Sequence, residues 1–306
     1  MMKIQLGRSG FKIPVVGFGA WQAGKVGWGN DYSDGDIIDA IRYSLKNGGN
    51  YIDTAEVYGM GHSEELVRAA TENLQRKDFI IATKVAPPHF RYKDVIKACE
   101  NSLKRLGTDY IDLYQLHWPD NYVPLKETLA AMEKLADEGL IRHIGVCNFP
   151  APLIRETINL LKDHDLVSNQ MRYNILQREV EEETYPLMKK HGVTMIAYSP
   201  IAKGLLTCKY DEKHLPPGEI RSSDPLFRTE NLKVMTGLFE RLRELSDKYK
   251  CKPGTVALAY LIQKGAAVIP GAKNMEQVKE NLVAGDLQLT QDEVKSLEMS
   301  IDLDYF

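Results

Sequence analysis

The chain has 306 residues, of which 43% are hydrophobic and 26% are charged, and its formal net charge is −3. This composition is that of a soluble globular protein; it provides neither the basic surface of a nucleic-acid-binding protein nor the ~20 consecutive apolar residues that cross a bilayer. The cysteines form no C-x-x-C motif and the first residues lack the apolar run of a signal peptide, so we expect a cytoplasmic protein without a disulfide framework or a metal site.

Apolar runs that predict β-strands alternate along the chain with longer segments of helical periodicity. A short hairpin is expected first, at residues 3–14. Eight strands are then expected at residues 15–19, 50–54, 79–85, 111–117, 141–146, 166–170, 193–199 and 266–270. Of the helices between them, one is expected to begin near Pro124 and to end at Gly139. Another is expected to begin at Ser63, a residue type that caps helices.

Strands that alternate with helices form βα units around a parallel sheet. Eight such units in one chain of this length predict a single domain, residues 1–306, folded as a closed (β/α)8 barrel of the TIM type. An open doubly wound sheet is the alternative, but "VVGFGAW" lacks the G-x-G-x-x-G motif that usually follows its first strand. Two long loops, residues 20–33 and 200–230, follow strands and therefore lie at the carboxyl end of the barrel.

Polar residues stand at the ends of three successive predicted strands. Asp53 ends the second strand, Lys84 lies near the end of the third, and His117 ends the fourth. Tyr58 follows in the loop after the second strand, so all four side chains should converge on one rim of a barrel. Because a nearby cation lowers the pKa of a tyrosine, we expect Lys84 to tune Tyr58 as a proton donor to a developing alkoxide. The aspartate would hold the lysine, and the histidine would hydrogen-bond a carbonyl oxygen.

Each of these residues taken alone has an ordinary structural explanation. An aspartate at a strand end is commonly a turn or cap residue, a lysine there is commonly solvated, and a histidine in an apolar strand is commonly structural. Four such residues on successive strand ends are better explained by a shared chemical task. A tyrosine that protonates an alkoxide also requires a hydride donor.

Six motifs along the chain resemble those of the aldo-keto reductase superfamily. They occur in the family's order over residues 15–285: "YIDTAEVYGMGHSEELV", "IIATKV", "SLKRLGTDYIDLYQLHWPD", "EGLIRHIGVCNF", "IAYSPIAKGLL" and "IPGAKNMEQVKEN". The resemblance implies a barrel that binds a nicotinamide dinucleotide, usually NADPH, without a G-x-G-x-x-G motif. By motif position, the family's catalytic tetrad, in which the tyrosine is the general acid, corresponds to Asp53, Tyr58, Lys84 and His117.

The resemblance also implies where the cofactor binds. Asn148 and Gln170 would hydrogen-bond the nicotinamide carboxamide, and Tyr198 would stack on the ring. Without the resemblance, turn capping and core packing would explain Asn148 and Tyr198 more simply. The segment "SPIAKGLL" would present backbone N–H groups to the pyrophosphate through Ser199, Gly204 and Leu205. The segment "GAKNMEQVKEN" would meet the adenosine end of the cofactor through Gly271, Lys273, Gln277 and Asn281.

The last of these segments departs from a common family pattern. That pattern has a lysine directly after "IP" and an arginine six positions later, both near the 2′-phosphate, where this chain has Gly271 and Gln277. Lys273 is the remaining basic candidate, so NADP(H) is expected as the cofactor while NAD(H) stays open. Cys147 stands where serine is frequent in the family, and we expect a free thiol without a redox role.

Aromatic residues on the loops above the expected barrel mouth indicate a substrate pocket. Trp21, Trp28 and Trp118 are expected to line it beside Tyr58, although loop aromatics also pack against one another. The polar residues 30–32 leave room for a sugar. The sequence does not decide which aldehyde or ketone binds.

The expected activity is the reduction of a small aldehyde or ketone to an alcohol. Three alternatives remain open: the same chemistry run as oxidation of an aldose or polyol, a cofactor-binding regulatory subunit, and a phosphate-binding barrel hydrolase or isomerase. The complete tetrad argues against the regulatory subunit. The expected partner is a small-molecule carbonyl or alcohol substrate, and the sequence indicates no oligomeric state.

Overall fold

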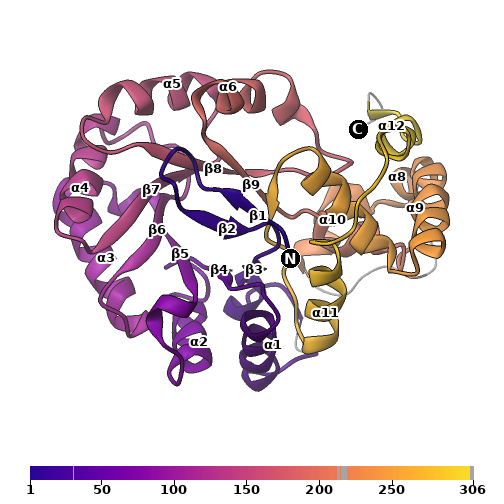
Figure 1. The fold of residues 1–306 in the computed structure, drawn as a ribbon, viewed down its shortest axis with the longest axis horizontal. Helices are drawn as coiled ribbons and strands as arrows, with labels where there is room; N and C mark the ends of the chain where they lie inside the picture. The colour runs from indigo at the N-terminus through magenta and orange to yellow at the C-terminus, as the bar shows by residue number, and fades with distance from the viewer. Residues whose placement is uncertain (30, 212–213, 215–218, 304–306) are drawn as a thin grey trace.

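The computed structural model describes residues 1–29, 31–211, 214 and 219–303. An N-terminal hairpin pairs β1 (Lys3–Gln5) antiparallel with β2 (Lys12–Pro14) (Figure 1). In the described part of the chain, eight parallel strands then pair in chain order: β3 (Phe18–Gly19), β4 (Tyr51–Asp53), β5 (Ile80–Val85), β6 (Ile111–Leu116), β7 (Ile141–Cys147), β8 (Leu166–Arg172), β9 (Thr194–Tyr198) and β10 (Ala267–Val268).

The first and last strands of this sheet meet and close it. Parallel bridges join Val16 to Val268 and Gly19 to Gly271. The Gly17 N–H also donates to the Val268 carbonyl at 2.9 Å. The predicted (β/α)8 barrel is therefore confirmed, and the open doubly wound sheet is wrong.

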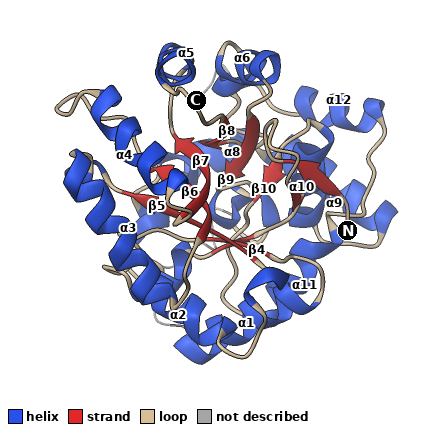
Figure 2. Cartoon of the chain, turned by 60° about the vertical axis from the view of Figure 1, so that its left-hand side comes forward, coloured by secondary structure: helices blue, strands red, loops and turns tan. Residues whose placement is uncertain are grey.

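Helices surround the barrel on its outside (Figure 2). Those that follow strands or close the chain are α1 (Asp34–Lys46), α2 (His62–Thr71), α3 (Tyr92–Leu106), α4 (Leu125–Asp137), α5 (Ala151–Leu160), α6 (Thr184–His191), α9 (Thr236–Tyr249), α10 (Pro253–Gln263), α11 (Met275–Val283) and α12 (Gln291–Met299). The long loops contain short turns of helix, namely η1 (Trp21–Gly24), η5 (Ala202–Thr207), α7 (Glu219–Ser222), η6 (Pro225–Phe227) and α8 (Thr229–Val234).

Local sequence explains where two of these helices begin. Ser33 starts α1 with a capping box, in which its hydroxyl accepts from the Asp36 N–H and the Asp36 carboxylate accepts from the Ser33 N–H. The predicted start of α2 at Ser63 is wrong by one residue, because Gly61 (φ 96°) supplies the N-cap. The Ser63 hydroxyl instead donates to the Ala20 carbonyl at 2.9 Å and ties α2 to the loop after β3.

The hairpin covers the amino end of the barrel. Leu6 and Ile13 are fully buried and pack against the apolar residues inside it, which are Tyr51, Ile80, Ala82, Leu113, Val167, Ile196, Ala267 and Ile269. The Gly7 N–H donates to Thr194 Oγ1 at 2.7 Å, and that hydroxyl donates to the Gln5 carbonyl at 2.8 Å. Because the hairpin fills the amino end, access to the barrel interior is from the carboxyl end.

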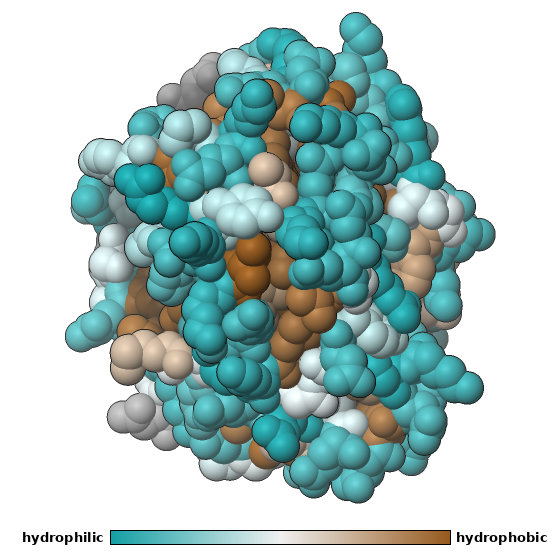
Figure 3. All heavy atoms as spheres, turned by 90° about the vertical axis from the view of Figure 1, so that its left-hand side faces the viewer, coloured by the Kyte–Doolittle hydropathy of each residue, from teal (hydrophilic) through white to brown (hydrophobic). Residues whose placement is uncertain are grey.

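One face of the molecule is largely hydrophilic (Figure 3). Figure 3 shows this face, where hydrophilic side chains cover most of the surface and hydrophobic ones lie in the gaps between them. This pattern is that of amphipathic helices whose apolar sides turn to the barrel. None of the helices in the described residues is long and apolar enough to span a bilayer.

Candidate active site

The inward-facing positions of three neighbouring strands change from apolar to polar at the carboxyl end of the barrel. Inward positions along a strand are two residues apart. In β4 and β5 the last inward positions are Asp53 and Lys84, and in β6 the last is Gln115, with His117 two residues further on. These four side chains are at most 2% exposed. A polar layer therefore lies directly above the apolar interior.

Lys84 is fully buried, and its ammonium group has three neighbours within the site. Nζ lies 2.5 Å from Asp53 Oδ1, 2.8 Å from the Thr54 carbonyl oxygen and 3.4 Å from Tyr58 Oη. A buried ion pair needs such additional hydrogen bonds to offset its desolvation. The arrangement fixes the ammonium group beside the tyrosine hydroxyl, as the sequence predicts.

Two amide side chains hold the other oxygen of Asp53. Gln170 donates to Oδ2 at 2.7 Å, and Gln115 donates to it at 3.2 Å. Both amides are buried. Gln115 is a site residue that sequence analysis missed. Its signal was a single uncharged polar residue at an inward position of an otherwise apolar strand end.

Burial keeps both Tyr58 and His117 neutral. Burial raises the pKa of Tyr58 to about 12, while the charge of Lys84 acts in the opposite direction. The expected lowering of this pKa is therefore wrong as a net effect, because burying a phenolate costs more than the ammonium restores. Burial, and then the charge of Lys84, lower the pKa of His117 to about 2. Its imidazole ring lies edge to face with Tyr58 at 5.7 Å and stacks on Trp118 at 3.6 Å.

Two cavities meet at Tyr58. The apolar cavity has walls formed chiefly by Trp21, Val26, Val57, Trp118 and Ile220, with Cys147 and Asn148 among its other lining residues. The long cleft extends from Tyr58 past the loop after β9 to α11. Trp21, Gln170 and Tyr198 line both cavities. Molecules bound in the two cavities would therefore meet beside the Tyr58 hydroxyl.

Most of the predicted cofactor residues line the long cleft. They are Gln170, Tyr198, Ser199, Gly204, Gly271, Lys273, Gln277 and Asn281. Asn148 lines the apolar cavity instead, where its Oδ1 accepts from the Tyr198 hydroxyl at 2.9 Å. Leu205 lines neither cavity, because its side chain is fully buried in the hydrophobic core. Only its backbone remains available for the role that the resemblance implies.

The three tryptophans predicted to form the substrate pocket lie in different places. Trp21 lines both cavities, and Trp118 lines the apolar cavity. Trp28 lines the long cleft and not the apolar cavity, and its ring meets that of Trp21 edge to face at 5.0 Å. The loop therefore places Trp28 beside the long cleft and not in the substrate pocket that the sequence predicts for it.

The loop after β9 adopts left-handed backbone conformations along the long cleft. They occur at Ser199 (φ 49°), Ala202 (φ 47°), Lys203 (φ 55°) and Gly204 (φ 100°). Such conformations at residues other than glycine cost about 1–3 kcal/mol each and collect at functional sites. Turns of this kind direct backbone N–H groups towards a bound anion. This strain supports a binding role for the loop.

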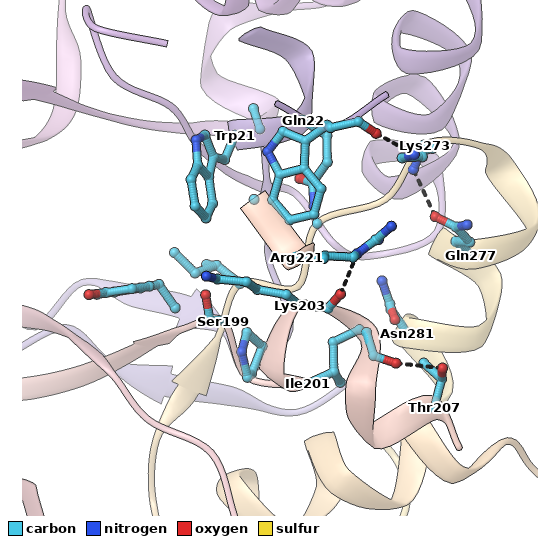
Figure 4. Close-up of a pocket in the computed structure, with 18 of the residues that line it drawn as sticks. Trp21, Gln22, Ser199, Ile201, Lys203, Thr207, Arg221, Lys273, Gln277 and Asn281 are labelled. Atoms are coloured by element: carbon cyan, nitrogen blue, oxygen red, sulfur yellow. Dashed lines mark hydrogen bonds between the residues drawn. The ribbon is translucent and has the colours of Figure 1, made fainter. Parts of the chain in front are cut away.

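Basic side chains line the long cleft around that loop, namely Lys203, Lys209, Arg221 and Lys273. Figure 4 shows Arg221 joined to the Lys203 carbonyl, to which its Nε donates at 2.9 Å. Positive charge and N–H donors suit a pyrophosphate, and the Tyr198 ring suits a flat heterocycle. The residues present therefore fit a dinucleotide. Arg221 was not predicted from the sequence, because it lies in the long loop outside every quoted motif.

At the α11 end of the long cleft, Lys273 is held within the protein. Its Nζ lies 2.6 Å from Asp31 Oδ1 and 2.9 Å from the Trp28 carbonyl oxygen, and its backbone N–H donates to Gln277 Oε1 at 2.9 Å. Glu280 also lines this end and was missed, although it directly precedes the predicted Asn281. The pairing of Lys273 with Asp31 had no signal in the sequence.

Cys147 is buried beside Gln170, with its Sγ 3.9 Å from Gln170 Oε1, and burial raises the pKa of its thiol to about 12. The thiol is therefore protonated at neutral pH, as expected for a cysteine without a redox role. Across the residues that the structure describes, no group of three or more histidine, cysteine, aspartate or glutamate side chains is arranged to hold a metal ion.

Comparisons with known proteins agree with this geometry. The family model for the "Aldo/keto reductase family" matches residues 15–302. An "NADH-specific methylglyoxal reductase" of Escherichia coli (strain K12) is 33% identical over 95% of this chain and 95% of its own length. The crystal structure of a thermostable aldo-keto reductase with the inhibitor epalrestat superposes with a TM-score of 0.83, at 35% identity over 98% of this chain and all of that one.

A second solved structure includes a cofactor. An aldo/keto reductase from Klebsiella pneumoniae, solved with NADP and acetate, has a TM-score of 0.78 and 29% identity over 98% of this chain and 95% of that one. The match to the family model covers nearly the whole chain, and the relatives agree with it in sequence and in fold. The chain belongs to the aldo-keto reductase family and is an NAD(P)-dependent oxidoreductase.

Proposed function

We propose that the protein reduces small aldehydes and ketones to alcohols, with NADP(H) as its cofactor and Tyr58 as the general acid. One observation carries this proposal. The Tyr58 hydroxyl lies where the apolar cavity meets the long cleft, and it is 3.4 Å from the buried ammonium group of Lys84. A proton donor beside a fixed positive charge is what a developing alkoxide requires.

A bound nicotinamide dinucleotide supplies the hydride. Tyr58 supplies the proton: the carbonyl oxygen gains negative charge, and the phenolic O–H donates to it as the C–O π bond breaks. Because the pKa of Tyr58 is about 12, the hydroxyl carries its proton throughout the neutral range. An alkoxide is a stronger base than a phenolate, so the transfer is downhill.

The charge of Lys84 acts after the proton has moved. Its ammonium group stabilises the phenolate that remains on Tyr58, and this stabilisation is strong because the Lys84 side chain is fully buried, where charges are weakly screened. Asp53 keeps the lysine in position, and the two amides on Oδ2 keep Asp53 in position. His117 is neutral, so its imidazole orients a carbonyl oxygen by hydrogen bonding without competing as an acid.

The long cleft would hold the cofactor from one end to the other. At the nicotinamide end, Gln170 would bond the carboxamide together with Asn148 from the adjoining wall of the apolar cavity, with the Tyr198 ring against the heterocycle. The turns at Ser199, Gly204 and the backbone of Leu205 would hold the pyrophosphate, and Gly271, Lys273, Gln277 and Asn281 would contact the adenosine end. The positive charges along the cleft support a dinucleotide, and Lys273 is the basic side chain that supports NADP(H); NAD(H) fits the same contacts without the 2′-phosphate.

The apolar cavity favours uncharged apolar substrates. Among its described lining residues none is charged, and the outer walls are Val26, Val57, Trp118 and Ile220. Of the polar residues 30–32, Asn30 lies outside the described part of the chain. Asp31 and Tyr32 do not line this cavity, and the Tyr32 hydroxyl donates to a backbone carbonyl. These walls support aliphatic or aromatic aldehydes as substrates over sugars.

Titration with NADPH and NADH, followed by steady-state assays on a panel of aldehydes and sugars, tests the proposal. We expect saturable cofactor binding and higher kcat/KM for apolar aldehydes than for sugars. Assays with alcohols and NADP⁺ measure the oxidative direction. A regulatory subunit would bind cofactor without steady turnover, and a barrel hydrolase or isomerase would bind neither cofactor. Either of these results would overturn the proposal.

A further inference from the structure

The ion pair between Lys273 and Asp31 lies at the end of the long cleft where the adenosine is proposed to bind. The lysine side chain is 9% exposed and the aspartate side chain is 63% exposed. Lys273 Nζ also donates to the Trp28 carbonyl and lies 4.7 Å from the centre of the Tyr32 ring. Two of its three donor directions are therefore used within the protein, and the acidic partner is the member of the pair that faces solvent.

The charges at this end of the long cleft do not favour a phosphate dianion. The adenosine end, defined by the lining residues Asp31, Gly271, Lys273, Gln277, Glu280 and Asn281, contains one cationic and two carboxylate side chains, and the charge of Arg221 acts on Asp31 from the adjoining part of the cleft. A 2′-phosphate placed beside Lys273 would meet the Asp31 carboxylate, which is bonded to the same nitrogen. Like charges repel at this range, whereas a carboxylate accepts a hydrogen bond from a ribose 2′-hydroxyl.

Building on the proposed function, we propose that Asp31 is a specificity-determining residue that limits the preference for NADPH over NADH. Its carboxylate occupies Lys273, repels the 2′-phosphate and accepts a hydrogen bond from the unphosphorylated ribose. Lys273, the basic residue predicted to bind the phosphate, is thus paired with Asp31, an acidic residue from the loop after β3 that lies 242 positions away in the chain.

A different role for the same pair makes opposite predictions. The ion pair joins the loop after β3 to the turn before α11, so it could instead act as a clasp that retains any dinucleotide. Loss of a clasp would weaken NADH and NADPH equally. Loss of an acidic specificity residue would tighten the binding of NADPH and leave the binding of NADH unchanged or slightly weaker.

The variant Asp31→Asn separates these roles, because it keeps the size of the side chain and removes its charge. Dissociation constants for NADH and NADPH would be measured by fluorescence at one ionic strength. We expect the NADPH constant to fall about ten-fold, the range of charge-assisted contacts to phosphate, while the NADH constant changes by less than about three-fold. Binding of 2′,5′-ADP compared with 5′-ADP should show the same gain, which tests the phosphate without any turnover.

Asp34→Asn is the matched control. Asp34 begins α1 three residues further on, pairs with Lys25 at 2.7 Å and lines neither cavity. The substitution Asp34→Asn removes the same charge from a nearby part of the surface and should leave the dissociation constants of NADH and NADPH unchanged. Raising the salt concentration should diminish the gain in Asp31→Asn, because the repulsion that it removes is screened.

An unchanged ratio of the NADPH and NADH constants in Asp31→Asn would overturn the inference, and equal weakening of both would establish the clasp. An equal gain in NADPH affinity in Asp34→Asn would also overturn the inference, because the effect would then be one of net charge. Failure of the wild-type chain to bind either dinucleotide would be a separate result and would count against the proposed function.

Discussion

Two lysine and aspartate pairs of nearly equal length occur at the two ends of the long cleft. Lys84 Nζ lies 2.5 Å from Asp53, and Lys273 Nζ lies 2.6 Å from Asp31. Both members of the first pair are buried, at 0% and 2% exposure, whereas the aspartate of the second is 63% exposed. Interatomic distance alone therefore does not distinguish them; their solvation does.

The difference in burial determines what each pair can do. A charge in the barrel interior is weakly screened and strongly held, so the pair of Lys84 and Asp53 can stabilise a charge on its neighbour. A pair with one exposed member, such as that of Lys273 and Asp31, is partly screened and adds little to stability, but its exposed charge meets any ligand that enters. The first pair is suited to chemistry and the second to selection among ligands.

The largest expected effect tests what the buried pair acts upon. Tyr58→Phe removes the only hydroxyl of that residue and leaves Lys84 and Asp53 in place. We expect kcat for carbonyl reduction to fall by at least ~10²–10⁴, because the proton donor is lost, while cofactor dissociation constants change little. Steady-state kinetics beside fluorescence titration measures both. A variant with half of the wild-type kcat would exclude Tyr58 from the mechanism.

Lys84→Met breaks the buried pair itself. The free energy of unfolding should fall by about 3–5 kcal/mol, because Asp53 is left buried without its partner. The residual enzyme should have a low kcat and a Tyr58 pKa above its present value of about 12, since Lys84 now lowers it.

The pH dependence of the rates shows in which direction Lys84 shifts the pKa of Tyr58. Reduction requires protonated Tyr58, so its kcat should be flat from neutral pH to at least pH 9 in both proteins. Oxidation requires the phenolate, so its rate should rise with pH, and the rise should move upward in Lys84→Met. Denaturant unfolding and two pH profiles provide the measurements. A downward displacement would show that Lys84 does not stabilise the phenolate.

The same substitution at the other pair should act on binding. Lys273→Met keeps the aliphatic length of the side chain but removes the ammonium group and leaves the Asp31 carboxylate in the cleft. NADPH affinity should fall about ten-fold, while NADH affinity changes little. Two dissociation constants per protein measure this. Equal weakening of both cofactors would place Lys273 outside phosphate recognition.

The smallest expected effect concerns stability. Asp31→Asn should lower the free energy of unfolding by less than about 1 kcal/mol, as is usual for an ion pair with an exposed member. Chemical denaturation of wild type and variant at low and high salt measures the difference. A loss comparable with that of Lys84→Met would show that exposure does not separate the two pairs as described.

The buried pair could be predicted from the sequence because it depends on regular structure. Alternation along β4 and β5 fixes the inward positions, and parallel pairing places Asp53 and Lys84 at the same end of the barrel. Helix limits set by glycine and proline were also predictable, as at Gly139 beyond α4. The start of α2 was misplaced because Gly61 and Ser63 are both capping residue types and only the packed structure selects one.

The exposed pair could not be predicted, because it joins two irregular segments. The position of Asp31 depends on how the loop after β3 folds, and Trp28 was misplaced for the same reason. The net shift of the Tyr58 pKa needed the depth of burial, which no motif encodes. Gln115 was missed for another reason: its signal, one uncharged polar residue at an inward strand position, is weak because an amide in a strand has no distinctive spacing.

The hairpin at the amino end has a consequence for the order in which the chain is assembled. Residues 3–14 leave the ribosome before the strands that they contact, yet Gly7 bonds to Thr194, 187 positions later, and Leu6 and Ile13 pack with Ile269. Contacts between such distant residues can form only after the intervening chain has been made and closed into a ring. The hairpin is therefore made before the strands that it packs against and finds its place after them, and until β10 emerges its apolar side chains stay available to chaperones and to other nascent chains.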